Sequence, residues 1–173
     1  MDARDLRQVF GLFATGVTVV TAYGKDGGPI GITANSFSSV SLDPPMVLWC
    51  LDNRSRHLPA FEHGAPFAIH ILSESQADIA LDFARSGASG LARLPEDRHA
   101  PPPHIDGAVA RIECHVANLC MAGDHTIIIG EVVSTGTMDA PPLVFQKSRF
   151  GRFVPSQKLS GEESWHILMD MWS

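Results

Sequence analysis

The hydrophobic positions at the start of the chain change from a helical to an alternating spacing. Residues 3–14 predict a helix, because apolar side chains recur at helical intervals and Gly16 follows as a stop. Residues 16–24 carry β-branched or small side chains on both alternating faces, which predicts a strand buried on at least one side. Residues 24–29 predict a turn, and residues 30–37 predict the second strand of a hairpin.

A polar stretch ends this hairpin, and a double proline follows it. Hydroxyl and amide side chains lie close together there: Thr33, Asn35, Ser36, Ser38 and Ser39. Asp43-Pro44-Pro45 then breaks the chain, because proline lacks the N–H that a central strand requires. A connecting loop does not need so many polar side chains, whereas they suit a loop that holds a polar ligand.

Short apolar runs predict two strands in the middle of the chain, at residues 46–52 and 66–73. Residues 55–64 between them predict a short helix with Ser55 as its N-cap. Residues 74–87 predict a longer helix, because their apolar side chains lie one turn apart and a glycine ends the segment.

The last part of the chain predicts a surface loop, three strands and a tail. Residues 88–104 are rich in glycine, proline and charge, which is typical of a loop, and strands are expected at 108–121, 125–136 and 143–146. The tail, 160–173, predicts a short amphipathic helix that packs at a subunit interface. Strands joined mainly by hairpins, with few helices, predict a mainly β fold, a small antiparallel barrel with helices outside it.

Composition narrows the class of protein. The 173 residues favour one domain with a sizeable core, and the net charge of −6 argues against nucleic acid or an anionic membrane as the main partner. No charged and then apolar leader follows Met1, and no apolar run is long enough to span a bilayer. We therefore expect a cytoplasmic protein that contacts neither membrane nor nucleic acid.

The usual catalytic motifs are absent from the sequence. There is no GxGxxG, no GxxxxGK[ST] and no GxSxG, and the cysteines show no CxxC spacing, which favours reduced thiols: Cys50, Cys114 and Cys120. The histidines form no HExxH or zinc spacing, so we expect no metal site. A metal or haem site is kept as an alternative on six of them: His57, His63, His70, His99, His104 and His115.

Several segments follow one another in the order of a known family: RQVFGLFATGVTVVTA, GITANSFSSVSLDPPMVLWCLDNRS, PFAIHIL, DHTIIIGEVV and PLVFQKSRFGRF. On these segments the chain resembles the flavin reductase-like family, which has the FMN-binding split-barrel fold. The resemblance covers about residues 6–153 of a single domain, 1–173, and leaves the tail 154–173 outside it. It implies an antiparallel Greek-key split β-barrel with short flanking helices, assembled as a homodimer.

The resemblance also implies an activity, that of an NAD(P)H:flavin oxidoreductase. Hydride passes from NADH or NADPH to FMN, or to FAD, and the reduced flavin serves a partner flavin-dependent monooxygenase. A second interpretation is an FMN-binding electron-transfer or carrier protein of the same fold with little turnover. The absence of a recognisable dinucleotide motif keeps that interpretation open.

The family's flavin-contacting residues match the polar stretch at these positions: Thr33, Ala34, Asn35, Ser36 and, just beyond, Ser38. Small side chains there let the backbone approach a flavin ring closely. Asn35 stands where the family often has serine, and its amide offers both a donor and an acceptor. The alternative is a polar turn capped by its own side chains.

The segment 52–56 lies between a predicted strand and a predicted helix, a place where free N–H groups hold phosphates. Its donors and cations are the expected ligands of the flavin phosphate: Asn53, Arg54, Ser55 and Arg56. The carboxylate of Asp52 is expected to point elsewhere. The alternative is a helix cap with solvated arginines.

His125 is the candidate catalytic residue, because the matching family histidine lies near the flavin and the nicotinamide. Hydride transfer needs no general base, so we expect positioning or charge stabilisation, and the alternative is an exposed turn histidine. Arg149 and Phe150 match a family stretch in which an aromatic residue, usually tyrosine, follows an arginine. Phe150 is expected to stack near the cofactor without the hydroxyl that tyrosine brings.

Overall fold

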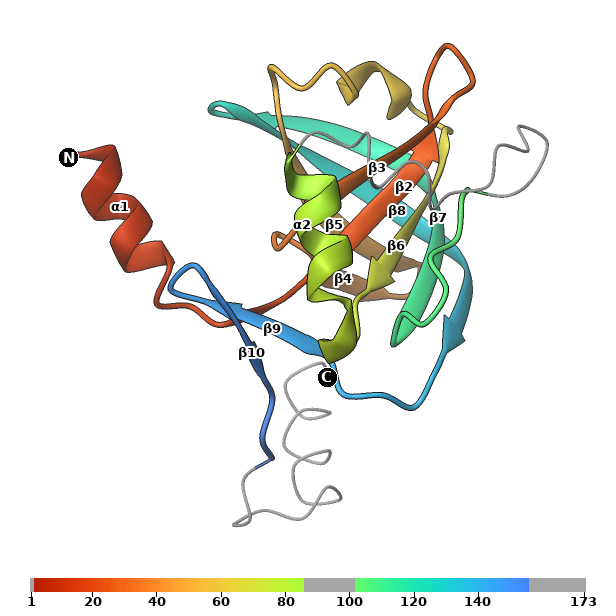
Figure 1. Cartoon of the computed structure of the whole chain (residues 1–173). Helices are drawn as coiled ribbons and strands as arrows, with labels where there is room; N and C mark the ends of the chain where they lie inside the picture. Colours follow the sequence, from red (N-terminus) through yellow and green to blue (C-terminus); the bar gives the residue numbers. More distant parts are fainter. Residues whose placement is uncertain (1, 86–101, 156–173) are drawn as a thin grey trace.

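The computed structural model describes residues 2–85 and 102–155 of the chain (Figure 1). Within these residues the helical elements are α1 (Ala3–Phe10), the 3-10 turns η1 (Leu58–Ala60) and η2 (Glu74–Gln76), and α2 (Ala77–Arg85). The strands are β1 (Thr15–Gly16), β2 (Thr18–Tyr23), β3 (Pro29–Ala34), β4 (Ser38–Leu42), β5 (Pro45–Asp52), β6 (Pro66–Ile71), β7 (Ala110–Ala122), β8 (His125–Thr137), β9 (Leu143–Gln146) and β10 (Arg149–Arg152).

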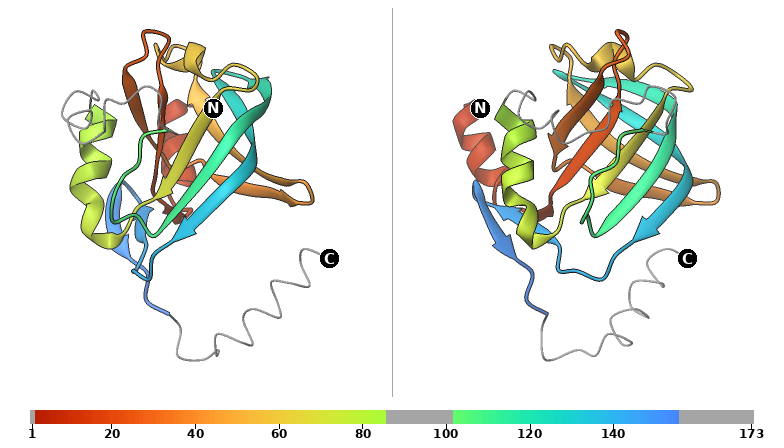
Figure 2. Two further views of the ribbon diagram at one scale, coloured as in Figure 1. Left: turned by 90° about the vertical axis from the view of Figure 1, so that its right-hand side faces the viewer. Right: turned by 45° about the vertical axis from the view of Figure 1, so that its right-hand side comes forward.

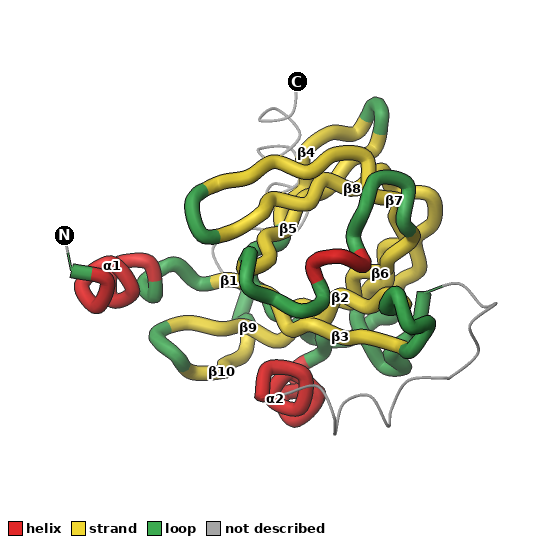
Figure 3. The backbone as a smooth tube through the Cα atoms, turned by 90° about the horizontal axis from the view of Figure 1, so that it is seen from above, coloured by secondary structure: helices red, strands yellow, loops and turns green. Residues whose placement is uncertain are grey.

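Seven of these strands form one antiparallel sheet in the order β3-β2-β6-β7-β8-β5-β4. Seen from above, they curl around a common interior, and the two end strands β3 and β4 do not pair with each other (Figure 3). Strands β1, β9 and β10 form a separate small antiparallel sheet. The predicted mainly β, antiparallel barrel architecture is therefore confirmed.

Aromatic side chains fill the interior of the barrel. Trp49, Phe61 and Phe67 are fully buried, and the rings of Trp49 and Phe61 meet edge to face with centroids 5.0 Å apart. Strand β5 alternates buried and partly exposed positions, as a strand with one face on the core should.

Helix α2 packs against the outer face of β3, and two contacts fix it there (Figure 2). The hydroxyl of Thr33 donates a hydrogen bond of 2.7 Å to the carbonyl of Ala80. Gly31 lies directly under the ring of Phe83, with which a Cβ atom at Gly31 would collide. The close approach of helix and strand therefore depends on the absence of a side chain at Gly31.

Two predicted helices differ from the structure. The first helix ends at Phe10 rather than residue 14: Gly11 is its C-cap, and the N–H groups of Leu12 and Phe13 bond three residues back, which tightens the chain into turns. The predicted helix at 55–64 is wrong: only the short turn η1 forms there, and the Ser55 hydroxyl accepts the His57 N–H in a local turn (3.3 Å). So short a segment has too few backbone hydrogen bonds to offset the cost of starting a helix.

The second strand of the hairpin, predicted at 30–37, ends at Ala34, so Thr33 and Ala34 are strand as expected. Ser38 and Ser39, interpreted as part of a polar loop, belong to β4, and only the residues between the two strands connect them. Pairing of β4 with β5 decides this outcome, since backbone partners outweigh the weak strand propensity of serine. The predicted tail helix and most of the loop at 88–104 lie outside the described residues.

A buried histidine makes the stability of the fold depend on pH. His70 is fully buried, its Nδ1 lies 3.3 Å from the Val19 carbonyl, and its Nε2 has no partner among the described residues. The pKa of His70 is lowered to about 4, mainly by burial. The hydrogen bond with the Val19 carbonyl raises the pKa, and the nearby His104 and Arg111 lower it.

We expect the free energy of unfolding to fall by about 3 kcal/mol as the pH drops from 6.5 to 4. In this range the histidine binds a proton in the unfolded chain, whereas buried His70 in the folded chain stays largely unprotonated. Urea unfolding at pH 6.5 and pH 4 measures this slope. His70→Leu should flatten it, while the same change at exposed His115 should not. An unchanged slope in His70→Leu contradicts the assignment.

Candidate functional site

A serine hydroxyl holds the connection between β3 and β4 against β5. The Ser36 hydroxyl accepts the N–H of Cys50 at 2.9 Å and donates to the carbonyl of the same residue at 3.4 Å. This pair of bonds holds the β3–β4 connection against Cys50, which lies two residues before Asp52, the last residue of β5. The hydroxyl of Ser36 is therefore already engaged with the backbone of Cys50.

The other predicted residues of the polar stretch divide into anchored and free groups. Thr33 is anchored to α2, and the carbonyl of buried Ala34 accepts the Thr18 hydroxyl at 2.7 Å. Asn35 is exposed beside Ser36, and exposed Ser38 donates to the carbonyl of its neighbour at 3.1 Å. Asn35 is thus the long polar side chain that this edge presents to solvent.

Asn53 ties the end of β5 to the turn between β7 and β8. Its N–H donates to the Asp124 carbonyl at 3.0 Å, and its side-chain amide donates to the Gly123 carbonyl at 3.1 Å. Its side-chain oxygen accepts the hydroxyl of buried Thr126 at 2.7 Å. These three bonds, which we call the Asn53 clamp, hold the segment 52–56 beside that turn.

The two arginines of the segment 52–56 have different surroundings. Arg54 binds Asp52 through two bonds, Nη2 to Oδ2 at 2.8 Å and Nε to Oδ1 at 3.2 Å. The Arg54 guanidinium holds the pKa of the Asp52 carboxyl well below its usual range. Arg56 contacts His57 at 3.2 Å and has no carboxylate partner in the described part of the chain. Arg56 therefore supplies the net positive charge of this segment.

His125 lies next to this segment, because β5 and β8 pair with Asp52 opposite His125. Its Nδ1 lies 2.8 Å from the Asp124 carboxylate, whose pKa it lowers, and the side chain is 44% exposed. The histidine is thus oriented by its neighbour and still open to a ligand. The structure brings together the β3–β4 connection, the segment 52–56 and His125 around the end of β5.

The structure does not bring Arg149 and Phe150 to that group within one chain. They lie on β10, below α2 and away from the β7–β8 turn (Figure 1). The Phe150 ring packs on Phe145 with centroids 5.4 Å apart, at the edge of the cluster that α2 covers. Any role of these two residues beside a flavin therefore depends on another element or another chain.

Metal chemistry finds no support among residues 2–85 and 102–155. No three His, Cys, Asp or Glu side chains meet there in a group that could hold a metal ion, and His99 lies outside these ranges. The cysteines in the same ranges are free thiols. None of the described helices is long and apolar enough to cross a bilayer.

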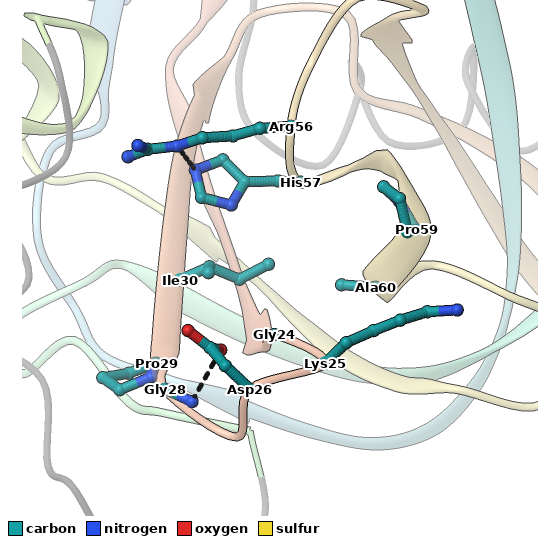
Figure 4. A pocket seen from close by; sticks show the side chains of 10 residues that line it. All are labelled: Gly24, Lys25, Asp26, Gly28, Pro29, Ile30, Arg56, His57, Pro59 and Ala60. Carbon is teal, nitrogen blue, oxygen red and sulfur yellow. Dashed lines mark hydrogen bonds between the residues drawn. The ribbon is translucent and has the colours of Figure 1, made fainter.

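The sequence did not point to a cavity that the structure places next to Arg56. It has a volume of about 720 Å³ and lies between the tip of the β2–β3 hairpin and η1 (Figure 4). For the hairpin tip the sequence predicts only a turn. Its one signal in the sequence is the pair of charged residues, Lys25 and Asp26, among glycines.

The chain matches the model of the flavin reductase like domain over residues 10–153, and it belongs to the flavin reductase-like family. The FMN reductase (NADH) SmoA of Agrobacterium fabrum is 47% identical over 152 residues, which cover 88% of this chain and 87% of that protein. The reductase component of the 4-nitrophenol 4-monooxygenase/4-nitrocatechol 2-monooxygenase of Rhodococcus opacus is 37% identical over 155 residues, 90% of this chain and 83% of that protein.

A solved structure agrees with the same assignment. The NADH:FAD oxidoreductase SgcE6 of Streptomyces globisporus, determined in complex with NAD and FAD fragments, superposes with a TM-score of 0.81 and 38% sequence identity. The match covers 91% of this chain and 96% of that one. The resemblance drawn from the sequence segments is therefore confirmed, and so is the split-barrel fold.

Proposed function

We propose that this protein is an NADH-dependent flavin reductase that delivers reduced flavin to a partner monooxygenase. The observation that carries the proposal is the Asn53 clamp. It holds the segment 52–56, in which Arg56 has no carboxylate partner among the described residues, beside the partly exposed His125. Relatives named FMN reductase (NADH), NADH-dependent FAD reductase and monooxygenase reductase component support the reaction and its purpose.

In this proposal the backbone at 34–36 lines the edge of the flavin ring, and Asn35 adds a donor or acceptor there. The Arg56 guanidinium and the hydrogen of the Ser55 hydroxyl, whose oxygen accepts the His57 N–H, hold the flavin phosphate. A bound flavin supplies the hydride-accepting chemistry. His125 positions the nicotinamide and takes no proton from it, because hydride transfer needs no base.

We also propose that the protein works as a cytoplasmic homodimer. Helix α1 has no buried residue in its own chain, although it is amphipathic, and the residues after it include Phe13 at 76% exposure. Large apolar side chains exposed in this way mark an interaction surface. A second copy of the chain would cover them and could bring Phe150 toward the flavin edge of its partner.

The test is a spectrum followed by an assay on the purified protein. We expect rapid oxidation of NADH, followed at its absorbance band, that requires added FMN or FAD. Arg56→Ala should raise the KM for flavin about tenfold by removing a charged hydrogen bond, whereas Arg85→Ala, an equal loss of charge on α2, should not. A yellow protein that oxidises neither NADH nor NADPH overturns the reductase and favours the flavin carrier.

A further inference from the structure

The cavity beside Arg56 has the size of a nucleotide site. Its volume of about 720 Å³ falls within the range of roughly 300–1,000 Å³ that is usual for small-molecule pockets. One side is the hairpin tip from Gly24 to Ile30, and the other is the chain from Arg56 to Ala60 (Figure 4). None of the roles assigned above to the flavin ring or to hydride transfer uses this space.

The walls of the cavity match the parts of an adenosine monophosphate. Ile30, Pro59 and Ala60 give an apolar surface, and the flat ring of His57 faces the same space (Figure 4). Burial is the main cause that lowers the pKa of His57, which favours the neutral form of its ring. A neutral imidazole and an apolar wall suit a purine base, which stacks on flat or apolar side chains.

Polar groups stand where the sugar and the phosphate would lie. One oxygen of Asp26 accepts the Gly28 N–H at 3.0 Å. The other has no hydrogen bond from the residues that the structure describes and can accept a ribose hydroxyl. Carboxylates are common partners of ribose hydroxyls in nucleotide sites. Arg56 stands at the rim next to His57, and Lys25 stands at the opposite rim, 3.6 Å from Glu62.

Arg56 belongs both to this cavity and to the segment proposed to hold the flavin phosphate. A second phosphate joined to the first would therefore extend toward the cavity. We propose that the cavity binds the adenosine 5′-phosphate end of a dinucleotide, either FAD or NADH. This proposal rests on the proposed flavin site for its direction, but the cavity itself can be tested without flavin.

The first experiment is a calorimetric titration of the full-length protein with AMP alone. We expect binding with a Kd below about 1 mM. Ala60→Phe should weaken AMP at least tenfold, because the added ring fills the space in front of Ile30. Ala84→Phe, the same change at an exposed position of α2, should bind AMP as the unchanged protein does.

A second pair of variants covers the case in which Ala60→Phe does not fold. His57→Ala removes the flat wall without adding volume and should weaken AMP at least threefold. His63→Ala removes an exposed histidine from the same segment between β5 and β6 and should leave AMP binding unchanged. No measurable AMP binding, or equal binding by the unchanged protein and the folded cavity variants, overturns the proposal.

Two further measurements identify the dinucleotide. If the cavity serves FAD, Ala60→Phe weakens FAD about tenfold and leaves the Kd of FMN within twofold. If it serves NADH, the variant raises the KM for NADH in an FMN assay and leaves the KM for reduced nicotinamide mononucleotide unchanged.

Either result supports the proposal. An equal loss of affinity for FAD, FMN and both electron donors overturns it. If the protein binds AMP but does not oxidise NADH, the proposed reductase activity fails while the proposed nucleotide cavity stands.

Discussion

Replacing Asn53 by alanine is expected to weaken flavin binding at least tenfold and to lower the free energy of unfolding by about 2 kcal/mol. Alanine removes two side-chain bonds of the Asn53 clamp and leaves the hydroxyl of buried Thr126 without its acceptor. The segment 52–56 then loses its fixed position beside the β7–β8 turn. Fluorescence titration with FMN and urea unfolding measure the two effects.

A matched control separates the clamp from a general loss of stability. Asn118→Ala removes another asparagine, whose side-chain oxygen accepts the Leu119 N–H at 2.8 Å on β7. We expect this variant to lose some stability and to bind FMN normally. Thr126→Val should weaken FMN as well, and its effect should not add to that of Asn53→Ala because one bond is shared. Normal flavin binding by Asn53→Ala argues that the clamp is not part of the site.

Phe67→Ala is expected to cost about 3–5 kcal/mol of stability, a large share of what a domain of this size has. Phe67 is fully buried, its ring lies 6.1 Å from that of Phe61, and it fills the space over Gly130, where a Cβ atom would meet it. The cavity left by alanine cannot close, because strands on both sides fix the surrounding backbone. Urea unfolding of the variant measures the loss.

Phe67→Leu provides the graded comparison for this prediction. Leucine fills most of the same space, so we expect a smaller loss, roughly a third to a half of that of alanine. If Phe67→Ala costs less than about 1 kcal/mol, the aromatic cluster is not the centre of the core.

Strand patterns were predictable where hydrophobic residues alternate or run together, as in β2, β5 and β8. Strand β4 was missed because its residues, Ser38 to Leu42, carry mostly polar side chains, and pairing with β5 fixes their conformation. The 55–64 helix was wrong for the opposite reason: the local signals were present, but nothing in the fold extends η1. Local patterns thus fail where distant partners decide.

The candidate site shows the same division. The sequence indicated which residue types gather, but not what each side chain binds. Arg54 was expected on a phosphate and binds Asp52, two residues away. Asn53 was expected on the same phosphate, yet its side chain reaches Gly123 and Thr126, far along the chain. Such partners become known only when the strands that carry them are placed side by side.

The pairing of Arg54 with Asp52 bears on how long a flavin stays bound. With Arg54 neutralised, the segment 52–56 offers a phosphate dianion one net positive charge, from Arg56, in an exposed setting that salt screens. Affinity differences between related complexes lie mostly in the dissociation rate. A weak electrostatic hold therefore favours a short residence time, as the proposed delivery of reduced flavin to a partner requires.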